Sequence, residues 1–380
     1  MIEQIRTELS VLKKNNLYRI RNQFDQTHLN FSENDYLGFR SNKKLITYAK
    51  KALSILGLGS GASPLVYGHH QAHANIEDKI SKIIGLEAGI LFNSGFVANL
   101  TFFKTIANEN IEVYMDKSCH TSMYEGVRIS GAKLIRYPHL DTAILENKLK
   151  KSSKSKTKII VTDALFSMDG DYADVNNLIK LSKKYNTYLY IDEAHSFGIC
   201  GERGEGLLSD CIKKLTKTEK RKLISLTTFG KAAGFYGSVL SCSNEIKDLL
   251  IQKSKEYIYS TNMPEFAASI LLNNTEALLK AQKKREKLKE NIKYFRSGFV
   301  NKRMLINSES PIQGIIINDV KKLIKIHDAL REKKIIVPVI RTPTVPPSKS
   351  RLRIIIRANH TKKEIKRLQR ELINLLDDQI

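Results

Sequence analysis

The 380-residue sequence has few cysteines and no long apolar run. No C-x-x-C pair occurs, so the cysteines indicate neither a disulfide framework nor a structural zinc site; they are Cys119, Cys200, Cys211 and Cys242. No apolar stretch approaches the roughly 18 residues that a membrane span requires. The first residues, MIEQIRTELSVLKKNN, mix both charge signs and lack the apolar region of a signal peptide. We therefore expect a cytoplasmic protein without a membrane partner.

Nucleotide-binding and metal-binding motifs are also lacking. The glycine-rich run GLGSGASPLVYGHH (57–70) has no G-x-x-x-x-G-K-[ST] pattern and does not follow a predicted strand. The DEAH sequence at 192–195 would suit an RNA helicase only beside a phosphate loop, and Gly230-Lys231 continues into alanine. His69, His70 and His73 have no acidic or cysteine ligand at a useful spacing, so we expect no metal and no nucleic acid.

The charge is strongly positive, with 63 Lys and Arg against 39 Asp and Glu and a net charge of +24. Much of it lies in lysine-rich runs at 150–158 and 283–289, which are typical of solvated loops and helix faces. Such a charge is also compatible with an acidic carrier protein or a phosphorylated thioester as partner. Both interpretations stay open at this point.

Strand-like runs alternate with helical segments through the middle of the chain. Runs at 111–116, 187–192 and 223–228 are separated by helical stretches, which predicts a mostly parallel, helix-covered sheet of an α/β protein. A strand–helix–strand–strand–helix pattern from 311 onward predicts a small C-terminal α/β domain. We expect an N-terminal segment (1–45), a large domain (46–275) and a small domain (276–380), since the length exceeds one simple core.

Polar residues follow several of the predicted strands, where parallel sheets gather their ligands. They are Asp163, Ser167, Asp192, His195, Thr228 and Lys231. A lysine amine and a buried carboxylate at neighbouring strand ends are what pyridoxal phosphate (PLP) needs, because the lysine forms a Schiff base and the carboxylate keeps the pyridine nitrogen protonated. The turn Asn93-Ser94-Gly95 before a helix adds a phosphate-binding N-terminus.

A series of motifs in one order resembles the α-oxoamine synthases, a branch of the fold-type I PLP enzymes, from about residue 17 to 360. The motifs are NFSENDYLG, GSGAS, LFNSGFVAN, DKSCHTS, TDALFSMDGD, IDEAHSFG, TTFGKAAG, IYSTNMP and RTPTVPPSKSRLRI. The TDALFSMDGD segment and the R-x-P-T-V-P loop are most similar to the biotin-pathway branch, which condenses L-alanine with a pimeloyl thioester. The thioester could be carried by coenzyme A or by an acyl carrier protein.

The resemblance implies roles for the cofactor residues. Lys231 would carry the cofactor and remove the α-proton of alanine, Asp192 would pair with the pyridinium nitrogen, and His195 would bind the phenolic oxygen. His120 would stack on the ring and assist the acyl step. Further cofactor contacts would come from Gly95, Phe96, Ser167, Thr228 and, from a partner subunit, Thr261. A homodimer with a shared active site is therefore expected.

The resemblance also implies a substrate site. Arg353 would bind the alanine carboxylate with help from Asn34, because a guanidinium matches a carboxylate in two hydrogen bonds. Thr344 and an N-terminal arginine, Arg19 rather than Arg21, would contact the acyl substrate. The sequence departs from the family pattern at two positions, where Pro64 replaces a frequent arginine and Asp163 replaces a frequent glutamate.

Alternatives within the family remain. Enzymes that use glycine with acetyl-CoA, succinyl-CoA or a long acyl-CoA share nearly all of the cofactor residues, so the cofactor motifs do not choose among them. A catalytically dead regulatory subunit is a further alternative, and the presence of Lys231, Asp192, His195 and His120 argues against it.

Overall fold

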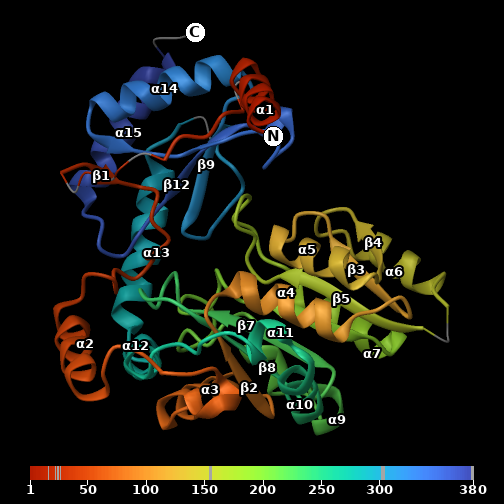
Figure 1. The fold of residues 1–380 in the computed structure, drawn as a ribbon. Coiled ribbons are helices and arrows are strands. Elements are labelled where there is room, and N and C mark those ends of the chain that lie inside the picture. Colours follow the sequence, from red (N-terminus) through yellow and green to blue (C-terminus); the bar gives the residue numbers. More distant parts are fainter. Residues whose placement is uncertain are drawn as a thin grey trace.

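The computed structural model describes residues 1–15, 17–21, 23, 25, 27–153, 156–300 and 304–377. Figure 1 shows a large sheet with its helices in the lower part of the molecule and a smaller sheet with helices above it. The long helix α13 (Gln282–Ser297) runs between the two parts, and the first helix, α1 (Ile2–Lys14), lies in the upper part with the smaller sheet.

The large sheet has seven strands in the order β2-β8-β7-β6-β5-β3-β4. Only β8 runs antiparallel to its neighbours, β2 and β7, and the other pairs are parallel. The central strands are buried along their whole length, as expected for a sheet covered on both faces. The strands are β2 (Ala88–Phe92), β3 (Ile111–Asp116), β4 (Lys133–Tyr137), β5 (Thr157–Asp163), β6 (Tyr188–Asp192), β7 (Leu223–Thr228) and β8 (Ser238–Cys242).

Helices cover this sheet and connect its strands. The helices before β8 are α1 (Ile2–Lys14), α2 (Lys43–Leu56), α3 (Gln71–Ile84), α4 (Gly95–Ile106), α5 (Thr121–Ser130), α6 (Thr142–Lys150), α7 (Val175–Tyr185), α8 (Ser209–Ile212) and α9 (Lys217–Lys220), with a π turn at Pro64–Gly68. After β8 come α10 (Asn244–Lys253), α11 (Lys255–Ile258) and α12 (Glu265–Leu279). Within the described residues, no helix is both long and apolar enough to cross a bilayer.

The smaller sheet is antiparallel, in the order β11-β12-β9. Its elements are β9 (Ile312–Ile316), α14 (Val320–Glu332), β11 (Val339–Ile340), a 3-10 turn (Pro347–Lys349), β12 (Arg351–Ile355) and α15 (Lys362–Asp377). The N-terminal segment joins this part of the molecule, because β1 (Leu29–Asn30) pairs with β10 (Ile335–Ile336) and the amide of Ile355 donates to the carbonyl of Phe31 at 2.8 Å.

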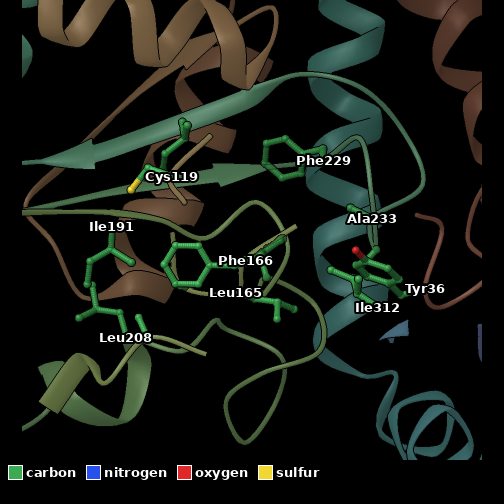
Figure 2. Close-up of a cluster of buried hydrophobic side chains, with 14 of the residues drawn as sticks. Tyr36, Cys119, Leu165, Phe166, Ile191, Leu208, Phe229, Ala233 and Ile312 are labelled. Carbon is green, nitrogen blue, oxygen red and sulfur yellow. The ribbon is translucent and has the colours of Figure 1, made fainter. Parts of the chain in front are cut away.

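One continuous apolar core extends from the large sheet into the smaller one. Figure 2 shows part of it, with Leu165 and Phe166 beside Ile191 of β6, and Phe229 from the segment that follows β7. These side chains lie directly behind the polar strand ends. The loops that follow β5, β6 and β7 therefore rest on packed apolar side chains, which fixes the polar groups they carry.

The structure confirms the α/β class and the mostly parallel sheet, and it differs in two elements. The second strand of the expected C-terminal strand–helix–strand–strand–helix pattern, IIVPV (335–339), is split into β10 and β11, because Pro338 lies between them and has no amide hydrogen for a strand ladder. The edge strand β4 was not predicted, since its residues are largely exposed and carry no apolar alternation. The division at residues 45 and 275 stays a prediction.

Candidate active site

A cavity of about 410 Å³ lies where β5, β6 and β7 end and helix α4 begins. The polar residues predicted at the strand ends all line it, together with an arginine from β12 of the smaller sheet. The predicted residues around it are Asn34, Gly95, Phe96, His120, Ser167, Asp192, His195, Thr228, Lys231 and Arg353. The cavity therefore brings together most of the site that the sequence predicts.

Asp192 lies at the end of β6 and is almost completely buried. Its Oδ1 accepts the amide of Ala194 and its Oδ2 accepts the side-chain amide of Asn99, both at 2.9 Å. Tyr190 in turn donates to the Asn99 carbonyl oxygen at 2.5 Å, which orients the amide group toward the carboxylate. Asp192 is thus held in one rotamer, with a hydrogen bond to each oxygen.

Lys231 follows β7 and is the one lysine among the described residues that line the cavity. Burial lowers the pKa of its amine and the charge of Arg353 adds to this shift, whereas Asp192 and Asp163 oppose it. Burial disfavours the ammonium form because the ion loses its hydration. Lys231 therefore has a larger fraction of neutral, nucleophilic amine than a surface lysine.

His195 is buried beneath the cavity and contacts Tyr36, whose hydroxyl lies 2.6 Å from Nδ1. Burial lowers the pKa of His195 well below its usual value, with further lowering by Lys231, Arg353 and His120. Burial also raises the pKa of Tyr36, so its hydroxyl keeps its proton and can donate a hydrogen bond to Nδ1. The neutral ring then carries its hydrogen on Nε2, the tautomer that can donate to an oxygen in the cavity.

His120 is the N-cap of α5, and its Nδ1 lies 2.7 Å from the Ser122 hydroxyl. Its backbone amide donates to Asp163 Oδ2 at 2.9 Å. Asp163 is the register neighbour of Asp192 in the sheet, and burial, followed by the charge of Asp192, raises the pKa of Asp163 well above its usual value. Asp163 therefore anchors His120 at a position where burial and the neighbouring Asp192 disfavour a second negative charge.

The N-terminus of helix α4 also lines the cavity and is suited to bind an anion. Ser94 caps α4 by accepting the amide of Val97, and the first turn of the helix directs its amides and its positive dipole end toward the cavity. A Cβ at Gly95 would approach Thr228 Cγ2 to 2.7 Å, so the two residues touch across the sheet and helix. Only glycine permits this close approach of the α4 N-terminus to β7.

Arg353 of β12 reaches the cavity from the other sheet, and only 6% of it is exposed. Its Nε donates to the Ser167 carbonyl at 2.8 Å, and both terminal nitrogens lie 3.3 Å from Asn34 Oδ1. No ion pair of Arg353 with a carboxylate occurs within the described residues, whereas the neighbouring Arg351 pairs with Asp169 at 2.9 Å. Because a buried charge without a counter-ion is costly, the Arg353 guanidinium is suited to receive an anionic group such as a carboxylate.

Three predicted residues lie outside this cavity. Thr261 is exposed and lines a separate hollow that also contains Pro64. Arg19 and Thr344 are exposed as well, and neither lines the cavity. Their contacts to a partner subunit or to an acyl substrate therefore stay predictions.

Comparisons with known proteins place this geometry in a family. The family model "Aminotransferase class I and II" matches residues 26–372. The 8-amino-7-oxononanoate synthase of Hydrogenovibrio crunogenus is 37% identical over 92% of this chain and 87% of its own length. That of Buchnera aphidicola subsp. Baizongia pistaciae is 37% identical over 99% of this chain and 95% of its own. The chain belongs to the 8-amino-7-oxononanoate synthase family. It is accordingly a PLP-dependent acyltransferase.

Solved structures agree with this assignment. Serine palmitoyltransferase of Sphingomonas wittichii superposes with a TM-score of 0.87 at 22% identity, covering 98% of this chain and 96% of its own. The 8-amino-7-oxononanoate synthase of Francisella tularensis has a TM-score of 0.79 at 28% identity, covering 93% of this chain and 99% of its own. The first likeness concerns the fold alone, which is that of the fold-type I PLP enzymes.

The cavity of this family member fits PLP at each of the cofactor's polar ends. The helix N-terminus with Gly95 suits the phosphate, the oriented carboxylate of Asp192 suits the pyridine nitrogen, and the amine of Lys231 suits the aldehyde. Within the described residues, no group of three or more His, Cys, Asp or Glu side chains is arranged to hold a metal ion. The donor set is that of an organic phosphate cofactor.

The structure adds site residues that sequence reasoning missed. In the sequence analysis, Tyr36 and Asn99 occur only as members of the motifs NFSENDYLG and LFNSGFVAN. Each is buried and hydrogen-bonded to a predicted site residue, His195 and Asp192 respectively. The available signal was their position within the family motifs NDYLG and FNSGFVAN, close to residues already assigned.

Proposed function

We propose that the chain catalyses the PLP-dependent decarboxylative condensation of L-alanine with a pimeloyl thioester, giving 8-amino-7-oxononanoate, CO2 and a free thiol in biotin biosynthesis. Family membership supports the reaction class. The observation that supports an amino-acid substrate is the environment of Arg353. Its buried guanidinium has no carboxylate partner in the described chain and lines the same cavity as Lys231. The cavity thus offers a guanidinium for a carboxylate together with a basic amine.

The residues of the chain divide the chemistry among them. When bound, PLP accepts the electron pair that remains on the α-carbon of alanine after proton loss, which makes this carbon a nucleophile. Lys231 holds the cofactor and then receives the α-proton, since burial keeps part of its amine neutral. Asp192 stabilises a proton on the pyridine nitrogen, and Nε2 of His195 donates to the phenolic oxygen. Arg353 and Asn34 orient the carboxylate that later leaves as CO2.

The acyl half of the reaction is assigned to residues near the cavity entrance and on a partner subunit. His120 lines the cavity and is exposed, so it can contact an entering thioester. Arg19 and Thr344 are the proposed acyl contacts, and Thr261 is the proposed phosphate contact from a second copy of the chain. The exposed position of all three is compatible with a site completed by a homodimer.

The proposed reaction is tested by comparing different pairs of an amino acid and a thioester as substrates. Alanine and glycine are each combined with pimeloyl and acetyl thioesters, and the products are identified by mass spectrometry. We expect release of CO2 and formation of 8-amino-7-oxononanoate from alanine and the pimeloyl thioester. A preference for glycine with acetyl-CoA would instead place the chain among the related synthases and would contradict this proposal. Salt-sensitive kinetics with an acyl carrier protein, but not with coenzyme A, would identify the carrier as the donor.

A Lys231→Ala variant tests the cofactor assignment separately. Borohydride reduction should fix PLP covalently on the wild-type protein at Lys231, and peptide mapping locates the adduct. The variant should bind PLP without a reducible link at this site. A reducible adduct elsewhere in the wild-type protein would refute the role of Lys231.

A further inference from the structure

A histidine behind the active site is held between two carboxylates. His139 Nδ1 lies 3.0 Å from Asp116 Oδ1, and its Nε2 lies 3.0 Å from Asp171 Oδ2. The side chain is 15% exposed, and its ring packs edge-on against Phe166 with 4.4 Å between the centroids. Both ring nitrogens donate when the histidine is protonated, so the cation bridges the end of β3 to the loop that follows β5.

This loop, residues 166–171, is where the smaller sheet rests on the larger one. Its Ser167 carbonyl accepts from Arg353, its Met168 carbonyl and Asp169 accept from Arg351, and its Gly170 carbonyl accepts from Ser308. These bonds join the loop to β12 and to the segment before β9. The position of Arg353 in the cavity therefore depends on the position of the loop.

We propose that His139 is a positioning residue that holds the 166–171 loop under Arg353 and thereby sets the affinity for the substrate carboxylate. The link runs from Asp116, through His139 to Asp171, and along the loop to the Ser167 carbonyl. The position of the Asp171 side chain depends on this link, because its other oxygen, Oδ1, is buried and has no hydrogen-bond partner among the described residues. The inference rests on the proposed function, since it assumes that Arg353 binds alanine.

The surroundings of His139 favour its cationic form. Burial alone would lower the pKa of His139, but the hydrogen bonds and charges of Asp116 and Asp171 outweigh burial and raise the pKa to about 9. Tyr124, Tyr137 and Cys119 also surround Asp116, and burial raises the pKa of each, so they stay neutral. The charged bridge is thus present at neutral pH and is lost as the pH rises through about 9.

The test measures the dissociation constant of L-alanine from the change in cofactor absorbance, with His139→Gln compared with the wild type at pH 7 to 10. Taking the ratio of the two constants at each pH cancels the ionisation of free alanine. At pH 7 we expect the variant to bind alanine about tenfold more weakly, the effect of losing one charged hydrogen-bonded bridge. At pH 10 the wild-type histidine is itself neutral, and the ratio should approach one.

Two further variants make the outcome unambiguous. Asp171→Asn keeps the side-chain shape but removes one of the charges that raise the pKa of His139, so its alanine affinity should decline at a lower pH than in the wild type. His28→Gln, a change at a histidine that lies beside Asp25 and outside the active-site cavity, should match the wild type throughout.

The possible failures are distinguishable. If the wild type does not bind alanine, the proposed function fails. If it does bind alanine but His139→Gln gives a ratio near one at every pH, or a ratio that stays constant with pH, the positioning role is refuted. If His139→Gln does not fold, the shifted pH dependence of Asp171→Asn decides, and an unshifted profile there refutes the inference.

Discussion

Replacing Arg353 by lysine keeps the positive charge and removes the geometry that binds a carboxylate. The guanidinium donates from Nε to the Ser167 carbonyl at 2.8 Å, contacts Asn34 Oδ1 at 3.3 Å and lines the cavity, where its terminal nitrogens can exchange the long Asn34 contacts for the substrate carboxylate. A lysine supplies one ammonium and loses one charge-assisted bond, worth about 1.5–3 kcal/mol. The dissociation constant of alanine should therefore rise about 10- to 150-fold.

The matched control is Arg351→Lys, two residues away on the same strand. Arg351 is buried and paired with Asp169 of the 166–171 loop, so this change should lower the melting temperature and weaken alanine binding less than Arg353→Lys does, because it acts only through the loop. The assay is titration of the bound cofactor's absorbance with alanine, supported by thermal unfolding. Equal losses of alanine affinity in both variants would show that strand packing, and not carboxylate recognition, explains the effect. An unchanged affinity in Arg353→Lys would refute the carboxylate role.

Three further predictions follow from the site and the smaller sheet. Tyr36→Phe removes the donor to His195 Nδ1. The pH titration of the bound cofactor's absorbance should therefore shift, and PLP should bind about tenfold more weakly. An unshifted titration contradicts the tautomer assignment. Gly95→Ala should weaken PLP binding, measured by fluorescence, and lower the melting temperature of the apo protein, because the new Cβ meets Thr228 Cγ2 at 2.7 Å. Unchanged PLP affinity argues against the close approach. Burial, with the charge of Arg357 adding to it, lowers the pKa of His360 to about 3, so its contribution to stability is present above its unfolded pKa and declines as the pH falls. Between pH 7 and 5 the free energy of unfolding should therefore fall by about 2 kcal/mol. Chemical unfolding of His360→Asn should show a smaller fall over the same pH range. An equal fall in the variant excludes His360 as the cause.

The sequence predicts the large sheet and the site on it well, because both depend on local patterns. Buried β-rich runs end directly at Asp163, Asp192 and Thr228, and parallel strands bring their carboxyl ends to one edge. Even without the family motifs, the shared edge of the parallel strands predicts that Asp192 lies near Lys231. The order of the strands and the antiparallel direction of β8 follow from long-range packing, which the hydrophobic periodicity of the sequence does not predict.

The remaining parts of the site depend on contacts between distant segments. Tyr36 and His195 are separated by 159 residues, and Arg353 and Asn34 by 319, so no local spacing predicts that they touch. His139 was not singled out because its two carboxylate partners come from separate segments, Asp116 at the end of β3 and Asp171 in the loop after β5. Arg19 and Thr344 were assigned from motif position alone, and a single chain leaves both exposed.

The hydrogen bonding of the N-terminal segment bears on stereochemistry. Asn34 and Tyr36 belong to a segment joined to the smaller sheet, where the Ala358 amide donates to the Tyr36 carbonyl at 2.8 Å, and Arg353 lies on that sheet as well. Lys231, by contrast, follows a strand of the larger sheet. In the proposed reaction, residues on different sheets therefore bind the carboxylate and remove the α-hydrogen of the amino acid. If these roles hold, discrimination between L- and D-alanine depends on how the two sheets are placed relative to each other, and no single wall of the cavity determines it.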